Sequence, residues 1–500
     1  MSRLRKSLFA VIAAIAATMA ASALRAGDRY ERVFNKTLPF QGGKVTIDHR
    51  FGSLILRAQP GSNVVVKAVI RASNDEFGKE IKIIMVQEPS GISIRTIYPS
   101  NGHVSASFSL DDKTYYHLGN SFSYSVDYEI TVPENAPVAA TSRFGSIEAT
   151  GLKAPGELVN SQGSIALRNV SGTQRAESSF GSIDVQQSSA DLELKNTNGS
   201  IQVRSVQGNV SASTRFGSVI VLDATRNVTV HNANGSLQLR NIGGNAKVTG
   251  GFGSIEVSAV KGDLDLQNGN GPVEVRDITG KATIKNSFAS VHFTNIGRDL
   301  VVIANNSKVE GSKVGGTATI ESSLNGIELS DVAGSTKITG ANGNVTAVDL
   351  RGNLTVSNRF GLVRAERVRG SADIDNASGG VSLTDIGGTV KVRTTFGSSF
   401  LKGIGGAIQV ESGNGAISIG GLRGACQNIS AKTTFAPIRV ALPASPSYRV
   451  NAHTSFGEIN TAVPVTVTSK RESALEGKIG DGRCLLDLTT SNGSITIGKE

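Results

Sequence analysis

Three side chains capable of acid–base chemistry recur at intervals of 36 residues. Glu256, His292 and Glu328 each lie three places after the central position of a repeated triplet of the Phe-Gly-Ser type. If the chain returned to the same place every 36 residues, the three would be stacked neighbours. Paired carboxylates, here with an imidazole, are the groups that glycosidases and polysaccharide lyases use for catalysis. The pattern therefore admits a carbohydrate-active enzyme.

A structural explanation of these residues is the one we favour. The same position in the related units is occupied in turn by Glu148, Asp184, Ile220, Glu256, His292, Glu328 and Arg364. An outward-facing strand position that carries mixed charge for solubility would show this variety. The six His residues share no metal-ligand spacing, and no phosphate loop, nucleophile elbow or zinc pattern occurs. We predict no catalytic residue, no metal site and no cofactor.

A repeat of 18 residues positions these side chains. Glycine recurs at this interval from Gly145 to Gly415 in sixteen units without an insertion, with Ala, Ser or Asn in its place in three of them. Apolar residues alternate with polar ones after it, and a second glycine precedes a second alternating run. In one unit these positions are Ile201, Val203, Val206, Gly208, Val210 and Ala212. Alternation predicts short strands with one buried face, and the glycines predict bends.

Short strands and bends at a fixed period predict an all-β fold, a parallel β-helix or β-solenoid. In such a fold each coil stacks on the previous one, and residues at one repeat position form a column with a spacing of about 4.8 Å. A single coil cannot bury its apolar face, so the core is created by stacking. No helical period competes with this pattern.

The residue before the repeat glycine alternates between bulky apolar and small polar types. The apolar series includes Phe144, Phe180, Phe216, Phe252, Phe288, Phe360 and Phe396, and the polar series includes Asn198, Asn234, Asn270, Asn306, Asn342 and Asn414. This is a superperiod of 36 residues. Because solenoids stack like on like, we predict a coil of 36 residues with Phe216 stacked between Phe180 and Phe252. The alternative is a coil of 18 residues, in which Phe and Asn interleave in one column.

The two ends depart from the repeat. We predict a β-rich N-terminal cap at residues 28–140, regular solenoid at 141–424, and irregular coils with a cap at 425–500. The chain has two cysteines, Cys426 and Cys484, and we predict that a disulfide between them ties the C-terminal cap. Two buried thiols are the alternative.

The N-terminus has the pattern of a secretory leader. A basic start precedes an apolar run at 8–20, and small residues offer a cleavage site after Ala23 or, alternatively, after Ala26. The run is short for a membrane span of about 20 residues, so we predict that residues 1–23 are a cleaved signal peptide and that no membrane span follows. The net charge of +10 is spread along the chain, without the basic stripe typical of nucleic-acid binding.

The FGSI and NGSI repeats, the segment SVDYEITVP before them and the leader together resemble the bacterial putative-adhesin family, over about residues 40–500. This family is a domain of unknown function related to GIN-type head domains. The resemblance implies an extracytoplasmic parallel β-helix and no catalytic residues to transfer. We predict a non-enzymatic exported β-solenoid, periplasmic, at the cell surface or secreted. It would act in adhesin-like binding or as an envelope-associated scaffold, with glycans, envelope or surface material as partners. A polysaccharide lyase or glycosidase using Glu256, His292 and Glu328 is the alternative.

Overall fold

The computed structural model describes residues 30–99, 104–105, 116–118, 122–424 and 426–500. The signal peptide predicted for residues 1–23 lies outside these ranges. The chain forms two compact units, residues 1–163 and 164–500.

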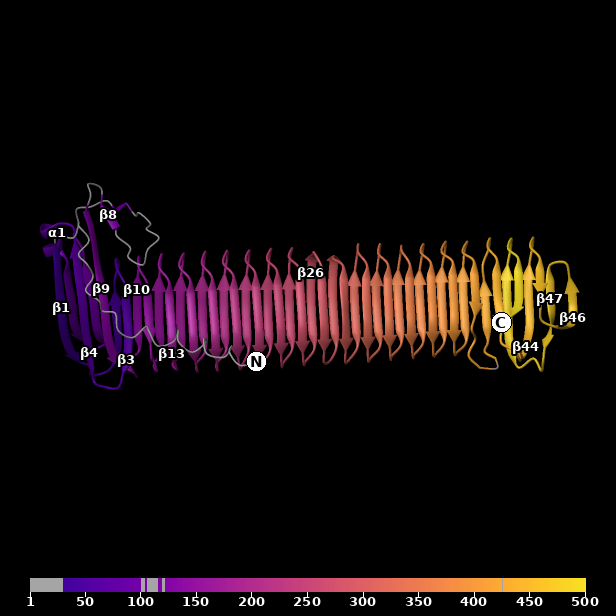
Figure 1. The fold of residues 1–500 in the computed structure, drawn as a ribbon, viewed down its shortest axis with the longest axis horizontal. Coiled ribbons are helices and arrows are strands. Elements are labelled where there is room, and N and C mark those ends of the chain that lie inside the picture. The colour runs from indigo at the N-terminus through magenta and orange to yellow at the C-terminus, as the bar shows by residue number, and fades with distance from the viewer. Residues whose placement is uncertain (1–29, 100–103, 106–115, 119–121, 425) are drawn as a thin grey trace, which may run out of the picture. The chain divides into compact units, whose positions relative to one another are not determined.

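Unit 2 is a stack of coils, each with two short strands that belong to two different sheets (Figure 1). In one coil, β19 (Val219–Ala224) leads through a bend to β20 (Val228–Asn232), and the next coil repeats this as β21 (Leu237–Ile242) and β22 (Ala246–Gly250). Val219 lies opposite Leu237 in a parallel ladder, and Val228 lies opposite Ala246. Each residue therefore lies beside the residue 18 places later.

The remaining strands of unit 2 follow the same scheme. The first sheet also contains β13 (Ile165–Val170), β15 (Ile183–Ser188), β17 (Ile201–Val206), β23 (Ile255–Val260), β25 (Val273–Ile278), β27 (Val291–Ile296), β29 (Val309–Val314), β31 (Ile327–Val332), β33 (Val345–Leu350), β35 (Val363–Val368), β37 (Val381–Ile386), β39 (Ser399–Ile404), β41 (Ile417–Gly420), β43 (Ile438–Leu442), β45 (Ile459–Thr461) and β49 (Ile495–Lys499). The second sheet contains β14 (Gln174–Ser178), β16 (Leu192–Asn196), β18 (Val210–Thr214), β24 (Leu264–Asn268), β26 (Ala282–Phe288), β28 (Leu300–Asn306), β30 (Ala318–Ser322), β32 (Thr336–Gly340), β34 (Leu354–Asn358), β36 (Ala372–Asn376), β38 (Val390–Thr394), β40 (Ile408–Ser412), β42 (Ile429–Lys432), β44 (Tyr448–Thr454), β46 (Thr466–Arg471), β47 (Ala474–Ile479) and β48 (Cys484–Thr490).

The β-solenoid with 18-residue units is confirmed, but the predicted coil of 36 residues is wrong. Phe216 lies beside the coils that carry Asn198 and Asn234, and its own N–H donates to Thr197 O at 3.1 Å. The rings of Phe180 and Phe252 are two coils away on either side. Every 18-residue unit has the same inward-facing pattern, so stacking unit on unit already aligns the whole core. The Phe and Asn side chains alternate at an exposed edge, where they have little influence on the register.

Each coil of the regular repeat buries two groups of apolar side chains between the sheets. β19 turns Val219, Val221 and Ala224 inward, although two outward residues separate the last two. The extra step is possible because Asp223 has a φ of +60°, which reverses the alternation. Equivalent residues with positive φ stand at this position in the neighbouring coils, many of them Asn or Asp, the non-glycine types that tolerate this conformation best. They define one edge of the solenoid, the left-handed edge.

A buried polar column supports the opposite edge, where the repeat glycines lie. Asn232 is fully buried at the end of β20. Its Nδ2 donates to Gly217 O at 2.9 Å in its own coil, and its Oδ1 accepts from Gly235 N at 3.1 Å. Thr214 makes the same pair of contacts in the preceding coil. These side chains satisfy backbone groups of the tight bends that water cannot reach.

The C-terminal end of unit 2 contains a coil out of sequence order. β48 pairs in parallel with both β42 and β44, and β49 pairs with both β43 and β45. The last strands of the chain are therefore inserted between two coils that precede them, and the hairpin of β46 and β47 lies beyond on β44. The predicted disulfide between Cys426 and Cys484 is present, and it joins the inserted coil to the coil of β42.

Unit 1 also contains two sheets. One has the order β1 (Tyr30–Pro39), β4 (Asn63–Ala72), β9 (Phe122–Pro133), β3 (Leu54–Gln59) and β11 (Ile147–Thr150), with β8 (Tyr116–Leu118) paired to β9 and β7 (Val104–Ser105) paired to β8. The other has the order β5 (Lys82–Glu88), β6 (Gly91–Ile97), β2 (Lys44–Asp48), β10 (Val138–Ser142) and β12 (Gly156–Asn160). The helix α1 (Asp75–Glu80) follows β4. No helix among the described residues is long and apolar enough to cross a membrane.

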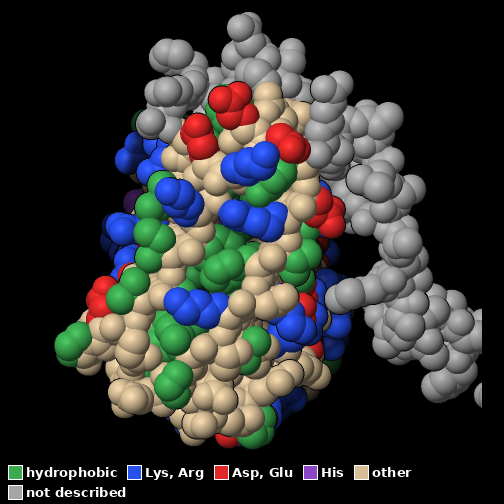
Figure 2. All heavy atoms as spheres, turned by 90° about the vertical axis from the view of Figure 1, so that its left-hand side faces the viewer, with side chains coloured by type: hydrophobic (Ala, Val, Ile, Leu, Met, Phe, Trp, Pro, Cys, Tyr) green, Lys and Arg blue, Asp and Glu red, His purple; other side chains and the backbone are tan. Residues whose placement is uncertain are grey.

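The outer strands β1 and β5 close one end of unit 1. Arg32 and Lys36 of β1 reach across to the carbonyl oxygens of Ile81 and Met85, the latter at 2.9 Å. Figure 2 views this end and shows Lys and Arg side chains lying across hydrophobic ones. Cations at a sheet edge discourage further strand addition, so these residues help to end the stack.

A buried network around His49 fixes the first bend of unit 1. His49 Nε2 lies 3.2 Å from Gly52 O and therefore donates to it, so Nδ1 is left to accept from the hydroxyl of Tyr98 at 3.2 Å. The ring also meets Tyr128 edge to face, with the centroids 5.0 Å apart. Burial lowers the pKa of His49 to about 4. The imidazole is thus neutral, and both of its nitrogens are satisfied.

Candidate functional site

Glu256, His292 and Glu328 lie on one outward-facing column, but they are not neighbours. Glu274 separates the first two and Glu310 separates the last two, as the ladder pairs show. Each of the three is thus two coils, about 10 Å, from the next. The arrangement that would have placed two carboxylates around one imidazole depended on the 36-residue coil.

The carboxylates of this column make ion pairs with basic residues. Arg276 contacts Glu256 at 2.9 Å and Glu274 at 3.1 Å, and Lys308 contacts Glu328 at 3.0 Å. Water and salt screen such exposed pairs, so they contribute little to stability. Among the described residues, no group of His, Cys, Asp and Glu is placed to hold a metal ion. The geometry is that of an outward column with mixed charge.

Paired charges also gather in a hollow on the left-handed edge. A groove of 610 Å³ crosses several coils there. Its charged lining residues are Asp331, Asp349, Arg351, Arg367, Arg369, Asp385 and Arg423. We call it the arginine groove, because four arginines face three aspartates.

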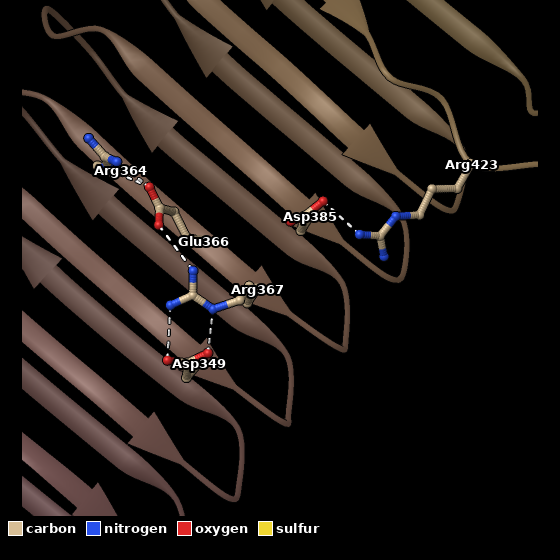
Figure 3. A network of polar contacts seen from close by, with 6 residues as sticks. All are labelled: Asp349, Arg364, Glu366, Arg367, Asp385 and Arg423. Carbon is tan, nitrogen blue, oxygen red and sulfur yellow. Dashed lines mark hydrogen bonds and ion pairs between the residues drawn. The ribbon is translucent and has the colours of Figure 1, made fainter. Parts of the chain in front are cut away.

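One section of the arginine groove is an ion-pair network (Figure 3). Arg367, at the positive-φ position of β35, contacts both carboxylate oxygens of Asp349 on the previous coil, at 2.6 and 3.0 Å. Glu366 accepts from Arg367 at 3.3 Å and from Arg364. The hydrogen bond from Arg367 lowers the pKa of Asp349 below its ordinary value. Asp349 therefore stays ionised, and Arg367 is held in place.

Arg423 is fixed in a similar way at the far end of the groove. It reaches Asp385, the positive-φ residue of β37, with a nitrogen–oxygen distance of 2.6 Å (Figure 3). The contact spans two coils, so the long side chain lies along the edge rather than out into solvent. It leaves the rest of the guanidinium free to face the groove.

A second section of the groove carries positive charge that is weakly paired. Arg351 and Arg369 occupy the same repeat position on successive coils, where their backbone N–H groups donate to equivalent carbonyl oxygens. The Arg351 side chain has one ion pair, with Asp331 at 3.7 Å, and the Arg369 side chain makes no hydrogen bond or ion pair with any other described residue. The same position on the next two coils is glycine, and Arg423 follows. Arginines thus border two coils that have no side chain at this repeat position.

Chemically, this arrangement is suited to anions. A guanidinium presents its N–H groups in a planar fork that matches a carboxylate or a sulfate group. A second hollow of 600 Å³ lies on the same edge near β19 and β21, where Asn241 donates to Asp223 at 2.7 Å. That hollow is lined mainly by amides, hydroxyls, carboxylates and small apolar side chains, so it has no comparable excess of cations.

Most of the chain matches the model of a known protein family. Residues 100–498 match the model of the Toastrack DUF4097 family. The chain belongs to this family. The predicted resemblance to a putative-adhesin domain of unknown function is thereby confirmed.

Two solved structures are similar at low identity. A putative cell adhesion protein from Clostridium sporogenes is 13% identical, covers 41% of this chain and 100% of its own, and has a TM-score of 0.25. A putative adhesin from Parabacteroides distasonis is 11% identical, covers 69% of this chain and 97% of its own, and has a TM-score of 0.16. At these TM-scores the likeness carries no argument about function. No curated protein matches the chain.

The arginines of the groove were not among the residues singled out from the sequence. Arg351, Arg369 and Arg423 share a repeat position, so an alignment of the 18-residue units brings them into one column. Their proximity also requires a coil of 18 residues. With 36 residues per coil, Arg351 would have stacked on Gly387 rather than beside Arg369.

Proposed function

We propose that this chain is an exported, non-enzymatic β-solenoid of the Toastrack family that binds acidic glycans of an envelope or surface in an adhesin-like way. The observation that supports it is the arginine groove. Arg369 and Arg423 stand three coils apart, about 14 Å, and the two coils between them carry glycine at this repeat position. This length accommodates several units of a linear polymer.

Charge is the basis of the proposed specificity. Arg367 is neutralised by Asp349, and Arg423 is partly neutralised by Asp385. Arg351 and Arg369 are therefore the cations available to a ligand. Their backbone positions are about 4.8 Å apart on successive coils, so both long side chains can reach one carboxylate or sulfate group with charge-assisted hydrogen bonds.

Export is the second element of the proposal. It rests on the leader pattern of residues 1–23, which lies outside the described residues, and on the disulfide between Cys426 and Cys484. Disulfides persist in oxidising compartments and are rare in the cytosol. A periplasmic, cell-surface or secreted location would place the groove where acidic polymers occur.

The test is binding of the chain to an array of acidic and neutral glycans, followed by titration with one acidic polysaccharide that scores. We expect R351A/R369A to weaken that binding at least tenfold, and we expect binding of the parent to fall steeply with salt. The matched control is R204A/R240A, which removes two exposed arginines of β17 and β21 and should bind like the parent. Equal loss in both variants, or no acidic glycan bound at all, would remove the proposal. Cleavage of a polysaccharide that E256Q/E328Q abolished would replace it with the enzyme alternative.

A further inference from the structure

Large apolar side chains are exposed in a single column along the edge opposite the left-handed edge. They are half exposed or more at nearly every member of the column, from 48% at Phe360 to 84% at Phe456. The members, which we call the Phe edge, are Phe180, Phe216, Phe252, Phe288, Leu324, Phe360, Phe396, Phe435 and Phe456. All belong to unit 2. Extensive exposed apolar surface marks an interaction site on most soluble proteins.

Small polar side chains, mostly Asn, separate the members of the Phe edge, and two of these amides fold back onto the backbone. Asn198 Nδ2 donates to Ser179 O at 3.0 Å, and Asn234 Nδ2 donates to Arg215 O at 3.0 Å, each on the previous coil. The amides therefore leave gaps one coil wide between rings that protrude every two coils, about 9.6 Å. The edge is a regular series of knobs and gaps.

The alternation continues in space where it fails in sequence. Phe435 and Phe456 are 21 residues apart, and no Asn of this column lies between them in the chain. The inserted coil places Asn492 there, because its N–H donates to Thr434 O and Phe456 N–H donates to Ser491 O. Duplication of a 36-residue unit could account for the regular part of the series but not for this coil. The alternation is therefore a property of the edge itself.

The spacing of the rings indicates which kind of partner can contact the whole Phe edge. Two residues of a β-strand advance about 6.7 Å, and seven residues of an α-helix advance about 10.5 Å. Against a spacing of about 9.6 Å, a helix would drift by about 7 Å over the eight intervals of the edge. A second copy of this chain has the same spacing at every knob.

The exposed area is also sufficient for a stable pair. An aromatic side chain offers roughly 150–250 Å², so nine members that are more than half exposed on average present about 1,000 Å². A standard interface buries about 800 Å² per partner.

We infer that two copies of this chain pair through their Phe edges, with the rings of one copy entering the gaps over the Asn side chains of the other. Rings enter gaps only if the copies are offset by one coil. A two-fold axis perpendicular to the stack provides this, and it makes the two solenoids antiparallel with an isologous interface. This inference concerns a different edge from the arginine groove and does not depend on the proposed function.

The test is the mass of the whole chain in solution by light scattering after gel filtration, over a range of concentrations. We expect twice the mass of one chain for the parent. F216S/F252S/F288S and, independently, F360S/F396S/F435S should each raise the dissociation constant at least tenfold. The control T229A/K247A/K285A changes three exposed residues of the second sheet and should stay dimeric. The circular dichroism spectrum checks folding, and two disjoint sets of exposed positions guard against a local defect.

A monomeric parent at every concentration would overturn the inference, as would dimers that survive both Phe variants. A monomeric parent whose glycan binding is lost in the Phe variants would also overturn it and would assign the edge to a polymer ligand. R351A/R369A should remain dimeric, so failure of the dimer and failure of the proposed glycan site can be told apart.

Discussion

Replacement of Asn232 by alanine should open the solenoid locally, because this one buried side chain serves both a carbonyl and an amide of the tight bends. Asn232 donates to Gly217 O at 2.9 Å and accepts from Gly235 N at 3.1 Å. The N–H of the exposed residue Asn234 donates to the same Asn232 Oδ1 at 3.2 Å. The side chain is fully buried, so water cannot take its place without an opening of the coil. Alanine leaves both backbone groups without this partner.

The expected cost can be worked out from these contacts. A buried polar group that loses its partner costs about 1–3 kcal/mol, so two such groups cost about 4 kcal/mol. The matched variant is Asn232→Thr, because Thr214 already makes the equivalent contacts in the preceding coil, at 3.2 and 3.4 Å. A threonine hydroxyl can donate and accept at once, so its cost should be below about 1.5 kcal/mol.

Hydrogen exchange of backbone amides is the suitable assay, since a repeat array opens locally and a single melting temperature would average over many coils. In Asn232→Ala, amides of residues 217–250 should exchange about a thousandfold faster, which corresponds to about 4 kcal/mol. Amides of residues 360–400 should be unchanged. Equal exchange in the alanine and threonine variants, or no change in either, would refute the role given to this column.

Two further results are expected from the ends of the chain. The pKa of His49 is lowered to about 4 in the folded chain, against about 6.5 in the unfolded chain. The contribution of neutral His49 to the stability of unit 1 is therefore fully present above pH 6.5 and is lost as the pH falls toward 4. About 2 kcal/mol of it is lost between pH 7 and pH 5. His49→Gln should flatten this part of the pH dependence of exchange in residues 44–59, and an unchanged dependence would contradict the assignment. Cys484→Ser opens a loop of 58 residues, at a cost of about 4 kcal/mol. Backbone amides should exchange faster only within residues 426–499. Faster exchange near residue 220 would contradict a local role of the disulfide.

The inward-facing residues of the solenoid could be predicted from the sequence, because alternation and glycine bends recur in every unit. The length of the coil could not. Both candidate lengths bury the same positions, and the column that distinguishes them holds Phe216 and Asn234 at an exposed edge. Like-on-like stacking stabilises buried rings, and the rings of this column are exposed. Phe51 and Phe144, which are buried in unit 1, do stack directly, with centroids 5.2 Å apart.

The site was less accessible to prediction than the fold. Arg351 and Arg369 form a candidate site because they lie on successive coils, next to two coils with glycine at the same position. This proximity follows from the coil length. The insertion of β48 between β42 and β44 also could not be deduced. The Asn492 triplet follows Gly457 by two whole units in sequence, which fits several orders of the coils in space.

Disulfide trapping across the second sheet tests the 18-residue coil, on which the arginine groove and the Phe edge both depend. Ser211 and Thr229 are exposed ladder partners on successive coils, about 4.8 Å apart, and Lys247 is one coil further, about 9.6 Å from Ser211. Two cysteines can be bridged when their Cα atoms lie within about 7 Å. Under mild oxidation, S211C/T229C should form the cross-link and S211C/K247C should not. The reverse result would show a coil of 36 residues and would contradict the account.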